Sequence, residues 1–357
     1  TANLTNNVTS ASYCTTTGNI CTPSTSATIS NNTYTVELEG NGNKQMVCTK
    51  LNGTSKVICG NPVEIQLTTL VDAVNEAYQN NPTMFAYDNT VDNNLRYIGS
   101  NPNNYVYFNC DDYQNPSSDT CELWRIIGVM NNMETADGTT ESLVKLIRSN
   151  SIGNYAWDDG NVNDWSASSL QESLNNSYLQ GTTFGNGKGI TETTRNMIEE
   201  AIWKLGGAGS YTSSSNGLAS HFYGYERGTT VYDGRPTEWS GKVGLMYPSD
   251  YGYATGGGAT TDRETCLATE LYNWGYTDFD SSDCYDNDWL FDKDNKWALT
   301  SSSSTSHTLF NVYNEGFLTG NNSANYNYNV YPSLYLKSNI TITRGDGSEN
   351  SPYTLNF

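Results

Sequence analysis

The sequence predicts a mixed α+β protein in which strands outweigh helices. Its 357 residues are enough to bury a sizeable core, although only 36% of them are hydrophobic. The 26 tyrosines and the abundant Asn, Ser and Thr are typical of extracellular β-rich proteins, because tyrosine and threonine suit half-buried pleated surfaces. Trp, Ile, Leu and Val recur in compact runs, so the composition is not that of a disordered chain.

An N-terminal β-rich module or arm with two cysteine pairs is predicted over residues 1–62. The segment 45–60 is typical of a hairpin with an Asn-Gly turn, and residues 33–40 alternate as a strand does. Residues 1–30 fit either a loosely structured arm or a strand donated to a neighbour.

A helical connector is predicted over residues 63–87. Its apolar residues recur with a helical period across 63–79, and the Asn-Pro pair at 81–82 ends the helix. The connector either links two modules or caps the main one.

The main domain is predicted over residues 88–357 and is organised around the stretch 121–176. Within it, residues 123–130 and 143–149 are two strongly apolar strands joined by a polar loop, which predicts a hairpin. Two helices follow in the prediction. The first covers 168–179, and the second covers 191–205 with Thr191 as its N-cap and glycines after its end.

The formal net charge of −20 excludes two classes of partner. Nucleic acids and anionic membrane surfaces both require clustered Lys and Arg, which this chain lacks. The surplus carboxylates keep the protein soluble through mutual repulsion, and the alternative is that some of them bind a divalent cation.

Eight cysteines fall into four local pairs, which favours four nearest-neighbour disulfides. The pairs are Cys14 with Cys21, Cys48 with Cys59, Cys110 with Cys121, and Cys266 with Cys284. Zinc is not expected, because the chain has only two histidines and no closely spaced Cys motif. The cysteine pattern therefore predicts an oxidising, extracellular environment.

The N-terminal residue, Thr1, is not a natural start, and the chain shows neither a signal peptide nor an apolar run long enough to span a membrane. We therefore expect that an export or anchoring segment has been removed. Seven Asn-x-Ser/Thr sequons would carry glycans only in a host with the required machinery.

Several segments carry a resemblance to a known family. They include DNNLRYIGSNPNNYVYFN, LWRIIGV, KLIRSNSIGNYAWD, NDWSASSLQESLN, GKVGLMYPSDYGYATGG, YPSLYLKSNI and GDGSENSPYTL. In their order and spacing, residues 88–357 resemble an uncharacterised domain family of exported and surface proteins from gut Firmicutes and Mollicutes-like bacteria. That family is similar to a divergent C-type-lectin-like fold of the formylglycine-generating-enzyme-like group. The resemblance implies twisted antiparallel sheets, two or three short helices and long ordered loops, and it implies no activity.

Aromatic residues in polar loops are the predicted binding residues, because an aromatic face can stack on a sugar or pack on a protein. These are Trp157, Trp165, Tyr223, Tyr225, Tyr251, Tyr253 and Trp274. Trp124, Trp239, Trp289 and Trp297 lie beside apolar residues and are predicted to be core. A loop rich in Tyr, Ser and Gly is typical of adaptable binding surfaces, but an ordinary packed loop has the same composition. A binding site is expected in residues 206–260 and 266–298.

An acidic stretch over residues 278–295 offers possible calcium ligands in Asp283, Asp286 and Asp288. The calcium-loop pattern Asp-x-Asx-x-Asx-Gly is absent, so a solvated acidic loop closed by a disulfide is the alternative. The tripeptide Arg344–Gly345–Asp346 is interpreted as a turn.

No coherent set of catalytic residues emerges, so no enzyme is predicted and no cofactor is expected beyond calcium. His221 and His307 lie in Ser/Gly-rich loops without a nucleophile motif, and no cysteine is left free for thiol chemistry. Two functions remain: a surface-exposed adhesion module that binds a glycan or a protein of a host or neighbouring cell, and a subunit of an extracellular filament or pilus made of copies of itself. An enzyme of unknown type is the third hypothesis.

Overall fold

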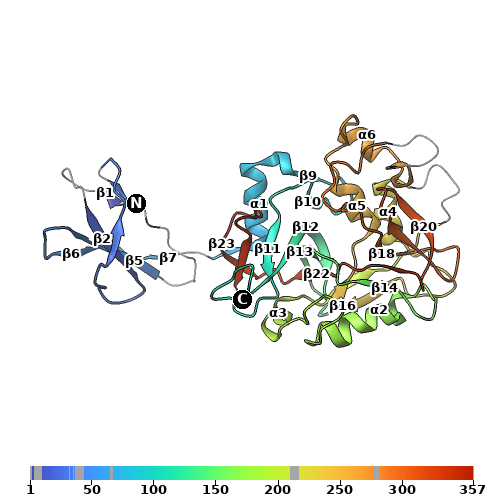
Figure 1. Ribbon diagram of the computed structural model, residues 1–357, viewed down its shortest axis with the longest axis horizontal. Coiled ribbons are helices and arrows are strands. Elements are labelled where there is room, and N and C mark those ends of the chain that lie inside the picture. The colour runs from blue at the N-terminus through green and yellow to red at the C-terminus, as the bar shows by residue number, and fades with distance from the viewer. Residues whose placement is uncertain are drawn as a thin grey trace. The chain divides into compact units, whose positions relative to one another are not determined.

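The computed structural model describes residues 2–3, 10–31, 33–34, 36, 44–64, 67–209, 217–275 and 282–356 (Figure 1). The chain divides into two compact units, Thr1–Thr68 with Thr341–Arg344 and Thr69–Ile340 with Gly345–Phe357. The architecture is mixed α+β, with many strands and a few short helices, as the sequence predicts. Residues 69–87, assigned to a connector from the sequence, lie in the larger unit.

The smaller unit is built around a sheet with the strand order β3-β2-β5-β6, and β7 also pairs with β5. Its strands are β1 (Ala2–Asn3), β2 (Ala11–Thr16), β3 (Thr25–Ala27), β4 (Thr33–Tyr34), β5 (Lys44–Leu51), β6 (Val57–Cys59) and β7 (Val63–Glu64). The predicted hairpin is confirmed, because β5 and β6 pair antiparallel with Cys48 opposite Cys59. Of the strand expected over 33–40, β4 is seen, and 35 and 37–40 lie outside the described residues.

The main sheet of the larger unit runs in the order β17-β22-β13-β12-β11-β24, and β10 pairs with both β12 and β9. These strands are β9 (Phe85–Tyr87), β10 (Leu95–Tyr97), β11 (Tyr105–Phe108), β12 (Glu122–Glu134), β13 (Thr140–Arg148), β17 (Val243–Gly244), β22 (Ser333–Leu336) and β24 (Tyr353–Asn356). The predicted hairpin is confirmed as β12 and β13, which pair antiparallel from Trp124 and Arg148 to Glu134 and Thr140. Two further strands, β8 (Thr68–Thr69) and β23 (Thr341–Arg344), neighbour each other.

A second sheet in the larger unit has the order β14-β21-β18-β19-β20, and β15 and β16 form a separate two-stranded sheet. The strands are β14 (Asn154–Ala156), β15 (Ala201–Lys204), β16 (Glu238–Gly241), β18 (Lys296–Ser301), β19 (Thr308–Val312), β20 (Leu318–Ser323) and β21 (Asn327–Asn329). Helix α5 (Pro248–Ala254) lies against β10 of the main sheet and against β18 and β19 of the second sheet. Its residues are buried along their whole length, so α5 joins the two sheets through the core.

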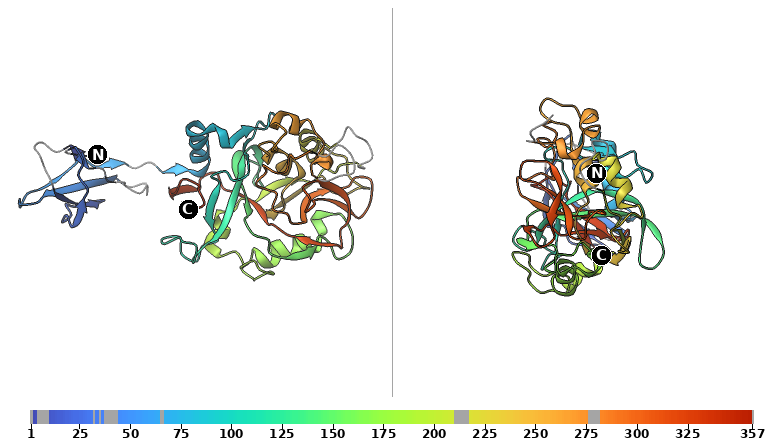
Figure 2. Two further views of the ribbon diagram at one scale, coloured as in Figure 1. Left: turned by 45° about the horizontal axis from the view of Figure 1, so that its top comes forward. Right: turned by 90° about the vertical axis from the view of Figure 1, so that its right-hand side faces the viewer.

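The other helices are short. They are α1 (Leu70–Asn80), α2 (Ser169–Glu172), α3 (Glu192–Met197), α4 (Ala219–Glu226) and α6 (Arg263–Leu267), with single turns η1 (Pro82–Met84), η2 (Trp165–Ala167) and η4 (Leu271–Asn273). The π-helix η3 (Ser173–Tyr178) follows α2 directly, so the two together cover most of the helix predicted over 168–179. In Figures 1 and 2 the green segment with α2 and α3 and the yellow-to-orange segment with α4, α5 and α6 lie on different sides of β12 and β13.

Two predicted helices are shorter than expected. The helix over 63–79 begins only at Leu70, because Thr69 caps it by accepting a hydrogen bond from the Asp72 amide. The helix over 191–205 has the expected cap at Thr191 but ends at Met197. The remainder becomes β15, in which Trp203 lies opposite Trp239 of β16, so tertiary pairing overrides the helical pattern.

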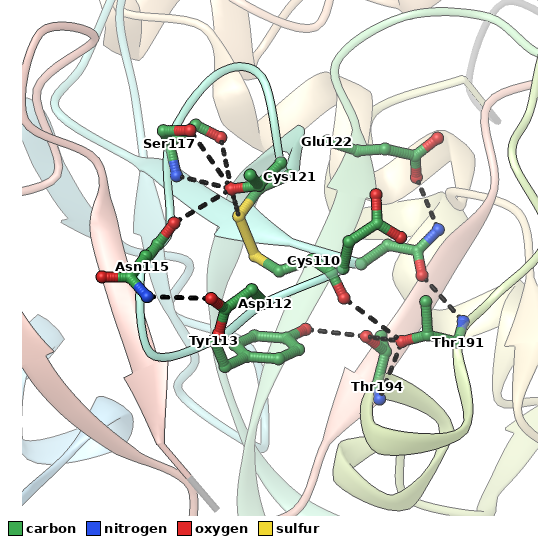
Figure 3. The surroundings of a disulfide bond; sticks show 12 residues. Cys110, Asp112, Tyr113, Asn115, Ser117, Cys121, Glu122, Thr191 and Thr194 are labelled. Carbon is green, nitrogen blue, oxygen red and sulfur yellow. Dashed lines mark hydrogen bonds between the residues drawn. A yellow bond between two sulfur atoms is a disulfide. The ribbon is translucent and has the colours of Figure 1, made fainter.

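All four predicted disulfides are confirmed, and no cysteine is free. Figure 3 shows the surroundings of Cys110–Cys121, which closes a polar loop after β11. Tyr113 of this loop shares a hydrogen bond of 2.8 Å with Thr194 of α3. The Thr191 hydroxyl donates a long bond of 3.5 Å to the Cys110 carbonyl, so the loop is tied to α3 as well as to β12.

Candidate functional site

The loop Asp88–Asn94 joins β9 to β10 and forms one wall of the candidate site. One carboxylate oxygen of Asp88 accepts hydrogen bonds from the Thr90 amide, the Thr90 hydroxyl and the Asn94 amide, at 2.8–3.1 Å. Its other oxygen accepts from the Asn94 side chain at 2.8 Å and from Arg96 at 3.1 Å. Asp88 therefore fixes the loop, and Val91 stands at its tip with 89% of its surface exposed.

Two tyrosines form the floor opposite this loop. Tyr223 of α4 donates a hydrogen bond to Asp92 and accepts one of 3.0 Å from the Asn94 side chain. The Arg227 guanidinium carbon lies 3.4 Å from the centre of the Tyr223 ring. Tyr253 of α5 packs beside Tyr223 in one buried cluster, and Arg96 approaches its ring at 5.4 Å. Asp92, Asn94 and Arg227 thus fix the Tyr223 ring, and Arg96 contacts the Tyr253 ring.

The space between the loop and the two tyrosines is a pocket of about 420 Å³, here called the tyrosine pocket. Its lining residues are Asp88, Asn89, Thr90, Val91, Ser220, Tyr223, Gly224, Tyr253 and Leu267. Burial raises the pKa of both Tyr223 and Tyr253 to about 12, so their hydroxyl groups are neutral at physiological pH. The pocket therefore offers aromatic and aliphatic surface with neutral hydroxyl and amide groups around it, and its one charged lining residue, Asp88, is paired with Arg96.

A buried charge cluster lies behind the pocket and consists of Arg96, Asp88, Asp250 and Lys145. Arg96 contacts Asp88 at 3.1 Å and Asp250 at 2.5 Å, and Lys145 contacts Asp250 at 2.6 Å. Burial alone would raise the pKa of Asp250, but Lys145 and Arg96 outweigh it and lower this pKa to about 2. Strand β10, which carries Arg96, pairs with β12 at Gly128. The two strands are so close there that a Cβ on residue 128 would lie 2.2 Å from the Leu95 carbonyl oxygen, so only glycine fits.

Glu226 at the end of α4 is another buried acid beside this cluster. Its carboxylate accepts hydrogen bonds from the Ser249 amide at 2.9 Å and the Ser249 hydroxyl at 2.5 Å, and Arg227 lies 3.3 Å away. Burial raises the pKa of Glu226 to about 7, although Arg227 and Ser249 oppose the shift. Glu226 therefore changes its protonation near neutral pH.

Among the seven predicted binding residues, only Tyr223 and Tyr253 line the tyrosine pocket. The expected surface exposure is wrong for Trp157, Trp165, Tyr251 and Trp274, which are at most 2% exposed. Tyr223 and Tyr253 are buried as well, at 4% and 3% exposed, so each presents only a small part of its ring to the pocket. Tyr225 is half-buried, with His221 and Phe222 as its ring neighbours.

The polar loops around the buried tryptophans explain this error. Trp157 donates to the Ala298 carbonyl at 3.3 Å and packs against Trp165. The neighbouring Asp158 and Asn163 are themselves buried and hydrogen-bonded to the backbone. A loop that satisfies its own polar groups can cover a core, so its composition resembles that of an exposed loop. Of the predicted core tryptophans, Trp124, Trp289 and Trp297 are buried and Trp239 is half-buried.

The three predicted calcium ligands do not gather into one group. Asp283 accepts hydrogen bonds from the Thr260 amide at 2.6 Å and the Thr260 hydroxyl at 2.9 Å, Asp286 is exposed, and Asp288 is buried. Burial raises the pKa of Asp288 well above its usual value. In the part of the chain that the structure describes, only Cys14, Cys21 and Cys48 bring three ligand atoms together, and all three are in disulfides.

Sequence reasoning missed the wall of the pocket and the buried charge cluster. A signal for the wall was the polar run between the short strands β9 and β10, which is typical of a structured Asx turn. A signal for the cluster was a charged residue inside an apolar strand, as at Arg96 and Lys145. Neither pattern says which distant residues complete the site.

None of the described helices is both long enough and apolar enough to cross a membrane. Comparison of the chain with protein-family models, with curated proteins and with solved structures gives no match.

Proposed function

We propose that this protein is an extracellular binding or adhesion module that takes a neutral glycan into the tyrosine pocket. The observation that carries the proposal is the pocket itself, with its volume of about 420 Å³, two tyrosine rings, and Asp88 as the charged member of its lining, already paired with Arg96. Small-molecule sites are typically concave and mostly apolar, with a few polar groups that fix orientation, and span roughly 300–1,000 Å³.

The chemistry of the lining favours a neutral sugar. The negative face of a tyrosine ring attracts the polarised C–H groups of a pyranose. The Tyr223 ring, held by Asp92, Asn94 and Arg227, loses little entropy on binding. Both Asp88 oxygens already accept hydrogen bonds, so they do not call for a cationic ligand. No Lys or Arg occurs among the described lining residues, so an anionic sugar would find no counter-charge.

The architecture and the disulfides support the wider proposal. Antiparallel sheets, short helices and long ordered loops fit a C-type-lectin-like fold, the one implied by the family resemblance. Four disulfides fit an oxidising, extracellular location.

A glycan array probed with the full chain tests the proposal, followed by calorimetric titration of the glycans that bind. Ser220 is an exposed lining residue of α4, so Ser220→Trp fills the pocket without disturbing the core. We expect this variant to bind at least about tenfold more weakly at an unchanged melting temperature. Tyr326→Ala, which removes a 52% exposed tyrosine that does not line the pocket, is the matched control.

Three outcomes would contradict the proposal: no neutral glycan binds, charged glycans bind as well as neutral ones, or Ser220→Trp binds like the wild type. Electron microscopy of concentrated protein addresses the other predicted function. Regular polymers would favour a filament subunit.

A further inference from the structure

Lys145 and Asp250 lie in contact inside the larger unit, although 105 residues separate them in the chain. Lys145 projects from β13, and Asp250 lies in the first turn of α5, where it also accepts a hydrogen bond from the Tyr247 amide. The Nζ to Oδ2 distance is 2.6 Å, and the side chains are 0% and 2% exposed. Both charged groups are therefore shielded from bulk water.

The Lys145 amine has few acceptors around it. An ammonium group carries three N–H donors, and within the described residues the Lys145 group donates one hydrogen bond, to Asp250. The rings of Trp203, Tyr247 and Tyr335 surround the nitrogen at 4.2–5.3 Å from their centres. Ring faces attract a cation but provide no lone pairs, so two donors lack conventional acceptors.

The charges of the cluster permit one cation and one anion to be removed together. Arg96 contacts both Asp88 and Asp250. If the Lys145 and Asp250 charges vanish as a pair, Arg96 and Asp88 remain as a neutral ion pair. Each buried ion carries a desolvation penalty, so eliminating two of them is favourable in this interior.

We propose that Lys145 and Asp250 condense to an intramolecular isopeptide bond after folding. The Lys145 nitrogen bonds to Cγ of Asp250, and the bond from Cγ to Oδ2 breaks. One of the three ammonium protons stays on the amide nitrogen, and the other two leave with Oδ2 as water. The reaction changes neither the net charge nor any oxidation state, so it needs no co-reactant.

The neighbouring groups provide the activation that this condensation requires. Proton transfer along the 2.6 Å contact gives the neutral amine and the neutral acid that react. This transfer has to overcome Lys145 and Arg96, which lower the pKa of Asp250 and so favour its charged form. Burial lowers the pKa of Lys145 to about 8, which makes the amine available, although Asp250 opposes the shift. Arg96 donates to Oδ1, where negative charge develops during attack, and thus acts as an oxyanion donor. Glu226 accepts hydrogen bonds from the amide and hydroxyl of Ser249, the residue before Asp250 in α5, and is thus a positioning residue.

Intact-mass spectrometry of the denatured full chain tests the bond. We expect the wild type to be lighter, by the mass of one water, than the sequence with four disulfides, and a digest to contain one branched peptide joining the segments of Lys145 and Asp250. Lys145→Arg keeps the cation but cannot form this amide, so it should show the full mass and a lower melting temperature. Asp250→Asn should instead lose ammonia.

Two results would overturn the proposal. A wild-type chain of full mass means that Lys145 and Asp250 form only an ion pair stabilised by the three rings. A water deficit that persists in Lys145→Arg means that it arises elsewhere, for example from a cyclised Asp-Gly pair. The wild-type measurement decides the question even where a variant fails to fold.

Discussion

The two units of this protein contain disulfides of the same size in very different surroundings. Cys48–Cys59 in the smaller unit and Cys110–Cys121 in the larger unit both span 11 residues and both have a Cα–Cα distance of 3.9 Å. In the described residues of 1–68, the buried apolar side chains are Ala11, Pro23, Tyr34 and Cys48. The larger unit instead buries seven tryptophans, six of which are at most 2% exposed.

This difference separates two ways of stabilising a fold. A disulfide acts mainly by restricting the unfolded chain, and for loops of this length it contributes about 3 kcal/mol wherever it lies. Burial of apolar side chains contributes stability in proportion to the area removed from water. That area is small in the smaller unit and large in the larger unit. The smaller unit should therefore depend on its cross-links and the larger unit on its core.

The largest effect is expected from Cys48→Ser combined with Cys59→Ser. Without this cross-link, the smaller unit should lose its sheet, because small disulfide-rich units seldom fold after losing about 2–5 kcal/mol. Hydrogen exchange measured by NMR should show loss of protection across residues 44–59 and unchanged protection in the larger unit. Retained protection in β5 and β6 would show that strand pairing alone stabilises the smaller unit.

Trp157→Ala tests whether the larger unit depends on its core. Trp157 is fully buried and hydrogen-bonded to the Ala298 carbonyl, so its loss should cost about 3–5 kcal/mol of unfolding free energy. Urea denaturation measures this cost, and Tyr326→Ala should change the free energy by less than about 0.5 kcal/mol. A similar small change for both variants would restore the original expectation that Trp157 lies at the surface.

Cys110→Ser with Cys121→Ser is the matched counterpart of the first pair. The expected cost is about 3 kcal/mol, and the larger unit should remain folded because its core is intact. Tyr113 also keeps its contact with Thr194, so opening should be confined to the loop between the two cysteines. Circular dichroism and limited proteolysis would detect this opening. Unfolding of the whole larger unit would contradict the contrast drawn between the two units.

The smallest effect expected is the pH dependence caused by Glu226. Its pKa is about 7 in the folded protein and 4.5 in the reference state, so the fold binds this proton more tightly than the unfolded chain does. The associated stability is present below pH 4.5 and is lost as the pH rises through 7. Between about pH 5 and pH 8, wild type should lose roughly 2 kcal/mol more stability than Glu226→Gln. If stability depends on pH in the same way in wild type and in Glu226→Gln, then Glu226 carries no extra proton in the folded protein.

Local patterns in the sequence were sufficient to predict the α+β fold class, the four disulfides, the hairpin of β12 and β13, and the N-cap of α3. Each of these features depends on residues that are close together in the chain. The Asn-Gly turn places Cys48 opposite Cys59, and the hydroxyl of Thr191 caps the helix that follows it. The same local logic failed at residues 198–205, where a helical pattern became a strand paired with β16.

The candidate site was decided by the tertiary structure. Tyr223 meets Asn94 across 129 residues, Lys145 meets Asp250 across 105, and Trp157 meets Ala298 across 141. Whether an aromatic or a charged side chain is buried depends on which distant segment covers it and supplies its hydrogen bonds. Composition and spacing along the chain do not identify that distant partner. The sequence therefore predicted Tyr223 and Tyr253 as binding residues but not the loop Asp88–Asn94 that faces them.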